Sequence, residues 1–161
     1  MNTFRNTYGK RLLLVFMVVV TAFALFGCGN NKITSVEEAR LSYSSYHSGG
    51  TVYEFVPEGD KIRICCYEDV YTEDGFVQEL KKSALVDTEK FIEHMNYCKV
   101  YRWDGFSGNA WGVMDGTSFT FTATVNEGDS IYAHGYMKFP KDYHEFLRGV
   151  NDMLDEAEET T

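Results

Sequence analysis

The stretch SFTFTATV-NEGD-SIYAHGY, from Ser118 to Tyr136, decides the fold of this chain. Its first eight residues alternate between apolar and hydroxyl side chains, which is the two-residue period of a β-strand. The motif NEGD then supplies a turn, and the return segment places Tyr132, His134 and Tyr136 on the side opposite the small and apolar residues. We therefore predict an antiparallel hairpin with one buried and one open face.

Four segments upstream of the hairpin extend this sheet. Strand patterns occur at about residues 40–46, 51–56, 61–68 and 76–85. The last of these segments could instead be helical from Glu79 onward. Turn signals rich in glycine and acidic residues separate the later segments, so we predict that they form a meander.

Two segments have the spacing of helices. Asp87 is a good N-cap for the first, in which Phe91, Met95 and Cys98 share a face. Asp142 caps the second, with Glu145 three residues later as in a capping box. One apolar stripe follows, made of Tyr143, Phe146, Leu147, Val150, Met153 and Leu154. We expect a two-layer α+β domain: an antiparallel sheet of about five to six strands, with two helices packed on one face.

The N-terminal segment has the composition of a leader. Arg5, Lys10 and Arg11 precede an apolar run, Leu12–Phe26, that is broken by a single threonine. The run is shorter than the roughly 20 residues that a membrane-spanning helix needs. A positive start, an apolar centre and a small residue before the break are the parts of a secretory signal peptide.

The leader ends in Leu25, Gly27 and Cys28. In this it resembles the signal of bacterial lipoproteins, which implies that Cys28 carries palmitate-type acyl chains and becomes the first mature residue. The resemblance also implies lipoprotein-processing enzymes and the membrane as partners, on the extracytoplasmic face of the cell membrane. A retained membrane helix and ordinary secretion are the alternatives. We expect a signal peptide (1–27), a short tether (28–34) and one α+β domain (35–161).

The net charge of the chain limits the classes of partner that it can bind. The full chain has a net charge of −9. Removal of the leader takes away three basic residues and no acidic one, so 12 basic residues face 24 acidic residues and the net charge becomes −12. Such a surface repels nucleic acid and anionic lipid headgroups. It suits a cationic partner, although solubility alone would also explain it.

Three cysteines follow Cys28, an odd number. Cys66 is in phase with the apolar side of its strand, and Cys98 lies on the apolar side of its helix, so a Cys66–Cys98 disulfide is one candidate. Free buried thiols are the alternative. The chain has no C-x-x-C motif and its four histidines are scattered, so we expect no metal and no cofactor.

The open face of the hairpin is the candidate binding face. It carries Tyr132, His134 and Tyr136 beside Thr120 and Thr122. Aromatic rings and hydroxyl groups can stack on a saccharide or pack on a protein partner. A solvated sheet face is the ordinary explanation, because one side of an antiparallel sheet is usually wet.

No catalytic residue is assigned. His134 or His47 could act as a general base only with a nucleophile and a carboxylate in reach, and the spacing predicts neither. Trp103 and Trp111 flank a glycine-rich segment. In one interpretation the segment is a loop that presents an aromatic platform to a ligand. In the other, Trp103 fills the edge of the core and the glycines allow tight turns. We favour the core plug for Trp103.

The last 60 residues or so carry a second resemblance. The segments Trp103–Phe106, Asp115–Phe119 and Gly135–Tyr143 contain a tryptophan, the motif DG-x-SF and the motif G-x-x-x-FP-x-x-Y. They are similar to small uncharacterised bacterial proteins in which this pattern enters a last helix. The resemblance implies the same α+β fold and brings no assigned activity.

These features together predict a lipid-anchored protein of the cell envelope that acts as a binding or structural module. An envelope hydrolase and an acidic protein of the inhibitor or immunity type are the alternatives.

Overall fold

The computed structural model describes residues 32–45, 49–73, 75–112 and 115–158. The signal peptide, Cys28 and His47 lie outside the described residues. In chain order the elements are β1 (Val36–Ser45), β2 (Gly49–Glu58), β3 (Lys61–Thr72), β4 (Gly75–Asp87), α2 (Thr88–Tyr97), the 3-10 helix η1 (Val100–Trp103), β5 (Phe106–Asn109), β6 (Thr117–Val125), β7 (Asp129–Tyr136) and α3 (Tyr143–Glu158).

The described strands form one mixed sheet in the order β4-β3-β2-β1-β6-β7-β5. The α+β class is confirmed, but the strand count of five to six is wrong, because seven strands are present among the described residues. The additional strand is β5, which has four residues, no alternating pattern and a parallel pairing with β7. Every other strand pair in this sheet is antiparallel.

The hairpin prediction is confirmed. β6 and β7 pair with Thr120 opposite His134 and Thr122 opposite Tyr132. The turn between them places Asn126 and Glu127 at positive φ, a conformation in which asparagine is enriched. Asn126 also bonds the start of the domain, since its Oδ1 accepts the Thr34 N–H at 2.7 Å.

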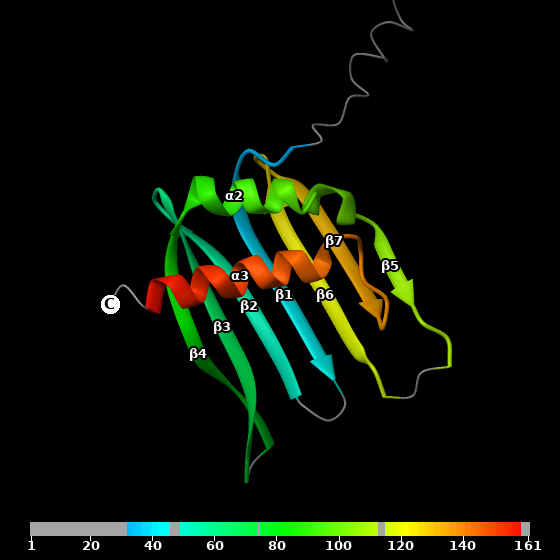
Figure 1. Ribbon diagram of the computed structural model, residues 1–161. Coiled ribbons are helices and arrows are strands. Elements are labelled where there is room, and N and C mark those ends of the chain that lie inside the picture. The colour runs from blue at the N-terminus through cyan, green and yellow to red at the C-terminus, as the bar shows by residue number, and fades with distance from the viewer. Residues whose placement is uncertain (1–31, 46–48, 74, 113–114, 159–161) are drawn as a thin grey trace, which may run out of the picture. The chain divides into compact units, whose positions relative to one another are not determined.

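The two helices cover one face of the sheet, with α3 lying across β1, β2 and β6 (Figure 1). An aromatic cluster fills the space beneath them: Phe55, Phe91, Phe121, Phe146 and Trp103. Trp103 is 1% exposed, and its indole N–H donates to the Lys141 carbonyl at 3.0 Å. The core plug predicted for Trp103 is therefore confirmed.

Lys32 and Ile33 lie inside the segment predicted as a tether (28–34), yet both are bonded to the domain. Ile33 is fully buried, and its N–H and C=O are both bonded to the side chain of Asn96, at 2.9 and 2.8 Å. The amide of Asn126 donates to the Lys32 carbonyl at 3.0 Å. Two asparagines thus fix the direction in which the chain enters the domain.

The three cysteines of the domain are buried free thiols, so the candidate Cys66–Cys98 disulfide is absent from the structure. Cys66 lies midway along β3, whereas Cys98 follows the far end of α2, just before η1. The two thiols are therefore carried to different parts of the core. Burial raises the pKa of the Cys66 thiol and raises the pKa of the Cys98 thiol to about 11.

We expect Cys98 to make the protein sensitive to alkali. Its pKa in the folded protein lies above its ordinary value of 9.0, so the stability linked to the neutral thiol is complete below pH 9 and is lost as the pH rises toward 11. Urea unfolding should show that Cys98→Ala loses less free energy of unfolding than the wild type between pH 8 and pH 11. The difference should be on the order of 2 kcal/mol. Identical pH profiles would contradict a neutral buried thiol.

Candidate functional site

The structure brings the five predicted binding residues together on the sheet face opposite the helices. Tyr132, His134 and Tyr136 point from β7, while Thr120 and Thr122 point from β6. The neighbouring strand β1 continues the surface, because Ser42 pairs with Thr120 and Arg40 with Thr122. We call this surface the open face. It is built by strand alternation alone, and it joins strands that are distant in sequence.

Three shallow hollows run end to end along the open face. The first, of about 320 Å³, is lined by residues of β1, β2 and β6, including Ser42, Ser44 and Thr120. The second, of about 400 Å³, lies over β5, β6 and β7 and shares Ser118, Phe119 and Thr120 with the first. The third, of about 350 Å³, shares Asn109 and Tyr136 with the second and ends at Trp111. Because adjoining hollows share lining residues, they form one continuous groove.

The end of the groove near Trp111 is aromatic. Trp111 is 97% exposed, and Tyr132 and Tyr136 line the adjoining hollow. The ring of Tyr132 lies 5.4 Å from that of His134. Trp111 is therefore exposed, as the alternative interpretation of the glycine-rich segment requires, while Trp103 belongs to the core; a ligand platform at Trp111 stays a prediction. Flat rings on an open groove can stack on the apolar faces of sugar rings.

The other end of the groove carries the hydroxyl groups of Ser42, Ser44, Thr51, Ser118 and Thr120, beside Arg40, Asp69 and Gln78. Arg40 bonds Glu54 at 3.0 Å, and the Asp69 carboxylate accepts the Gly50 N–H at 2.8 Å. The hydroxyls of Ser44 and Ser118 lie 3.0 Å apart across the strands. Because hydroxyls both donate and accept hydrogen bonds, this half of the groove suits a neutral polar ligand.

Ser107 is the site residue that the sequence did not indicate. It lies opposite His134 in the parallel β5–β7 pair, and its Oγ is 3.1 Å from the His134 Nε2. Only the recognition of β5 as a strand would have placed it there, and four residues without alternation give no such signal. The hydrogen bond orients the His134 ring along the groove.

The Ser107–His134 pair contains two of the parts that nucleophilic catalysis uses. Within the described part of the chain, no hydrogen bond joins His134 to a carboxylate that would orient it as a base. The other two described histidines lie on helices: His94 bonds the Phe146 carbonyl at 3.0 Å, and His144 packs on Phe139.

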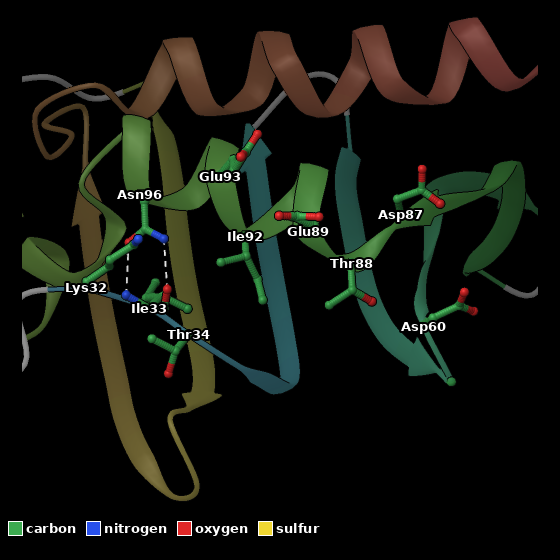
Figure 2. Close-up of a pocket in the computed structure, with 11 residues that line it drawn as sticks. Lys32, Ile33, Thr34, Asp60, Asp87, Thr88, Glu89, Ile92, Glu93 and Asn96 are labelled. Atoms are coloured by element: carbon green, nitrogen blue, oxygen red, sulfur yellow. Dashed lines mark hydrogen bonds between the residues drawn. The ribbon is translucent and has the colours of Figure 1, made fainter.

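A separate acidic hollow of about 700 Å³ lies where the chain enters the domain. Four carboxylates line it, from Asp60, Asp87, Glu89 and Glu93, together with Lys32. Figure 2 shows these side chains around the start of α2, with the two hydrogen bonds that join Asn96 to Ile33. Among the described residues, no three acidic, histidine or cysteine side chains are grouped closely enough to hold a metal ion. This hollow lies beside Lys32, the first described residue of the chain.

Comparisons with known proteins add no relative. No protein-family model, curated protein or solved structure matches this chain. Both resemblances noted in the sequence therefore stay predictions. In the portion of the chain that the structure describes, none of the helices has the length and apolarity to cross a membrane.

Proposed function

We propose that this chain is a lipid-anchored binding module of the cell envelope that holds a neutral saccharide chain along its open face. The observation that carries the proposal is the row of adjoining hollows, which ends in three exposed or partly exposed aromatic rings and carries several serine and threonine hydroxyl groups along the rest of its length. Extended saccharides offer both kinds of surface that such a groove recognises, apolar ring faces and hydroxyl edges.

The leader supports the envelope location. Cys28 precedes Lys32 by four residues, which span at most about 14 Å when extended. Because two asparagines hold the chain from Lys32 onward, a diacylglycerol on Cys28 would keep the domain close to the bilayer. Two acyl chains are enough for stable membrane binding. An envelope polymer would then lie within reach of the groove.

Charge supports a neutral ligand. The mature chain has a net charge of −12, which disfavours nucleic acid and acidic glycans. Of the charged residues at the groove, Arg40 is paired with Glu54, and one oxygen of the Asp69 carboxylate accepts the Gly50 N–H. The groove therefore recognises the saccharide through ring stacking and through hydrogen bonds with hydroxyl groups.

The test is a titration with an N-acetylglucosamine tetrasaccharide, which is neutral and extended. We expect Tyr132→Ala/Tyr136→Ala to lower the affinity about tenfold or more, since each aromatic contact contributes about 0.5–1.5 kcal/mol. Tyr97→Ala is the matched control, because Tyr97 is 70% exposed but lies on α2, in the helix layer. Calorimetry would measure both. Equal affinities for the double variant and the wild type would contradict saccharide binding at the open face.

A hydrolase is the second candidate, and the contact between Ser107 and His134 is the observation that favours it. A Ser107→Ala variant separates the two. Binding alone predicts that this variant changes tetrasaccharide affinity only slightly and that neither protein turns over an activated ester. Turnover by the wild type that disappears in Ser107→Ala would establish the hydrolase.

A further inference from the structure

The hairpin of β3 and β4 extends beyond the rest of the sheet. Glu68 is the last β3 residue that pairs with β2, and beyond it the described residues of β3 and β4 pair with each other alone. Figure 1 shows this ribbon projecting past the ends of the neighbouring strands. We call the described residues 69–73 and 75–78 the arm. A two-stranded ribbon without further support is only marginally stable in water. The arm therefore needs a function or a partner that explains its presence.

The arm exposes apolar side chains on both faces. Tyr71 lies opposite Phe76 with their rings 5.5 Å apart, and the two side chains are 75% and 65% exposed. Val70 and Val77 form the next pair, which alternation turns to the other face, and Val77 is also exposed. Cross-strand contact explains why the two rings touch. It does not explain why a solvent-exposed ribbon carries apolar side chains on both faces. Exposed apolar side chains grouped in this way are typical of an interaction site.

The charge of the arm is of one sign. From Glu68 to Glu79 the sequence contains five acidic residues and no basic one. The first bases beyond it are already paired, Lys81 with Glu79 and Lys82 with Asp155. Whatever covers the apolar side chains must therefore approach a negative field, which favours a cationic surface.

Charge disfavours two simpler occupants. A second copy would bring a second acidic arm and another net charge of −12 to the contact. Anionic lipid headgroups would likewise be repelled by the five acidic residues from Glu68 to Glu79.

We propose that the arm is a docking element for a cationic protein, which closes on both faces of the ribbon. The apolar pairs Tyr71–Phe76 and Val70–Val77 fill the partner's cleft, and the acidic residues around them meet its positive rim. The base of the arm adjoins the groove, because Asp69 and Gln78 line its first hollow, but the two apolar pairs line none of its hollows. An acidic arm of this kind also fits the inhibitor or immunity alternative, because such proteins act by occupying a partner's cleft.

The test replaces Phe76 by the photocrosslinker p-benzoylphenylalanine in the full-length chain, in its own cells. We expect an adduct with a protein of net positive charge, and Glu68→Lys/Glu73→Lys should weaken that adduct at least fivefold while leaving the melting temperature unchanged. Tyr132→Ala/Tyr136→Ala should leave the adduct intact. Failure of the saccharide site would therefore not affect this result, and the membrane fraction of the same cells reports the anchor separately.

Position 97 supplies the control, because Tyr97 is an exposed ring on α2. The crosslinker placed there should not capture the same protein. An adduct of Phe76 with a second copy, with lipid or with an acidic protein would overturn the proposal. So would the absence of any adduct, or an adduct that survives the charge reversal at full yield.

Discussion

Replacing Trp103 by alanine should lower the free energy of unfolding by about 3–5 kcal/mol. Trp103 packs against Phe121 and Phe146 with ring centroids 5.2 and 5.4 Å away, and it joins η1 to the sheet and to α3. Its removal leaves a large cavity among side chains that cannot collapse, because β6 and α3 fix them. It also removes the hydrogen bond to the Lys141 carbonyl.

The chain offers a matched control in its second tryptophan. Trp111→Ala should change the free energy of unfolding by less than about 0.5 kcal/mol, because Trp111 is almost fully exposed. It should nevertheless weaken tetrasaccharide binding if the groove is the ligand site. Urea unfolding followed by fluorescence measures both variants, since each retains one tryptophan. Similar losses for both variants, or a loss below about 1 kcal/mol for Trp103→Ala, would contradict the assignment of Trp103 to the core.

Cys28→Ala should abolish retention of the protein in the membrane fraction, or leave the leader uncut. In the proposed anchor the Cys28 thiol is the group that takes the diacylglycerol. Without two acyl chains, an acidic domain has little affinity for a bilayer. Fractionation of cells followed by immunoblotting measures the effect, which should be close to complete.

Cys65→Ala is the control for this experiment, because Cys65 is a buried thiol of the folded domain. It should be processed and retained like the wild type. A Cys28→Ala protein with wild-type size and wild-type retention would rule out lipidation at this residue.

Alternation and helical periodicity predicted much of the fold, but the side-chain cap predicted at Asp87 is absent, because this carboxylate accepts a hydrogen bond from Lys61 and makes none to the helix. The β6–β7 hairpin follows from the strict pattern of Ser118–Val125, and α3 from the apolar stripe that starts at Tyr143. Glu79 lies in a strand and not in a helix, because pairing with β3 along the whole of β4 outweighs local helix propensity. These elements were predictable because their signals are local.

Non-local features were not predictable in this way. β1 lies between β2 and β6, and no local pattern specifies a partner some 80 residues away. β5 forms because β7 offers it an edge, and Gly108 permits the approach: an added Cβ would lie 2.9 Å from the Lys138 carbonyl oxygen.

The binding face illustrates the same limit. Tyr132, His134 and Tyr136 were predictable from alternation, whereas Ser107 and the groove depend on pairings between distant strands. The arm is similar, because its exposure depends on where β2 begins and not on the sequence of β3 or β4.

The most direct test of the account is the mass of the N-terminal peptide of the protein extracted from its own membranes. A leader that delivers the domain to the envelope predicts a chain that starts at Cys28 and carries a thioether-linked diacylglycerol. A chain that retains Met1 and has an unmodified Cys28 would contradict the anchored binding module.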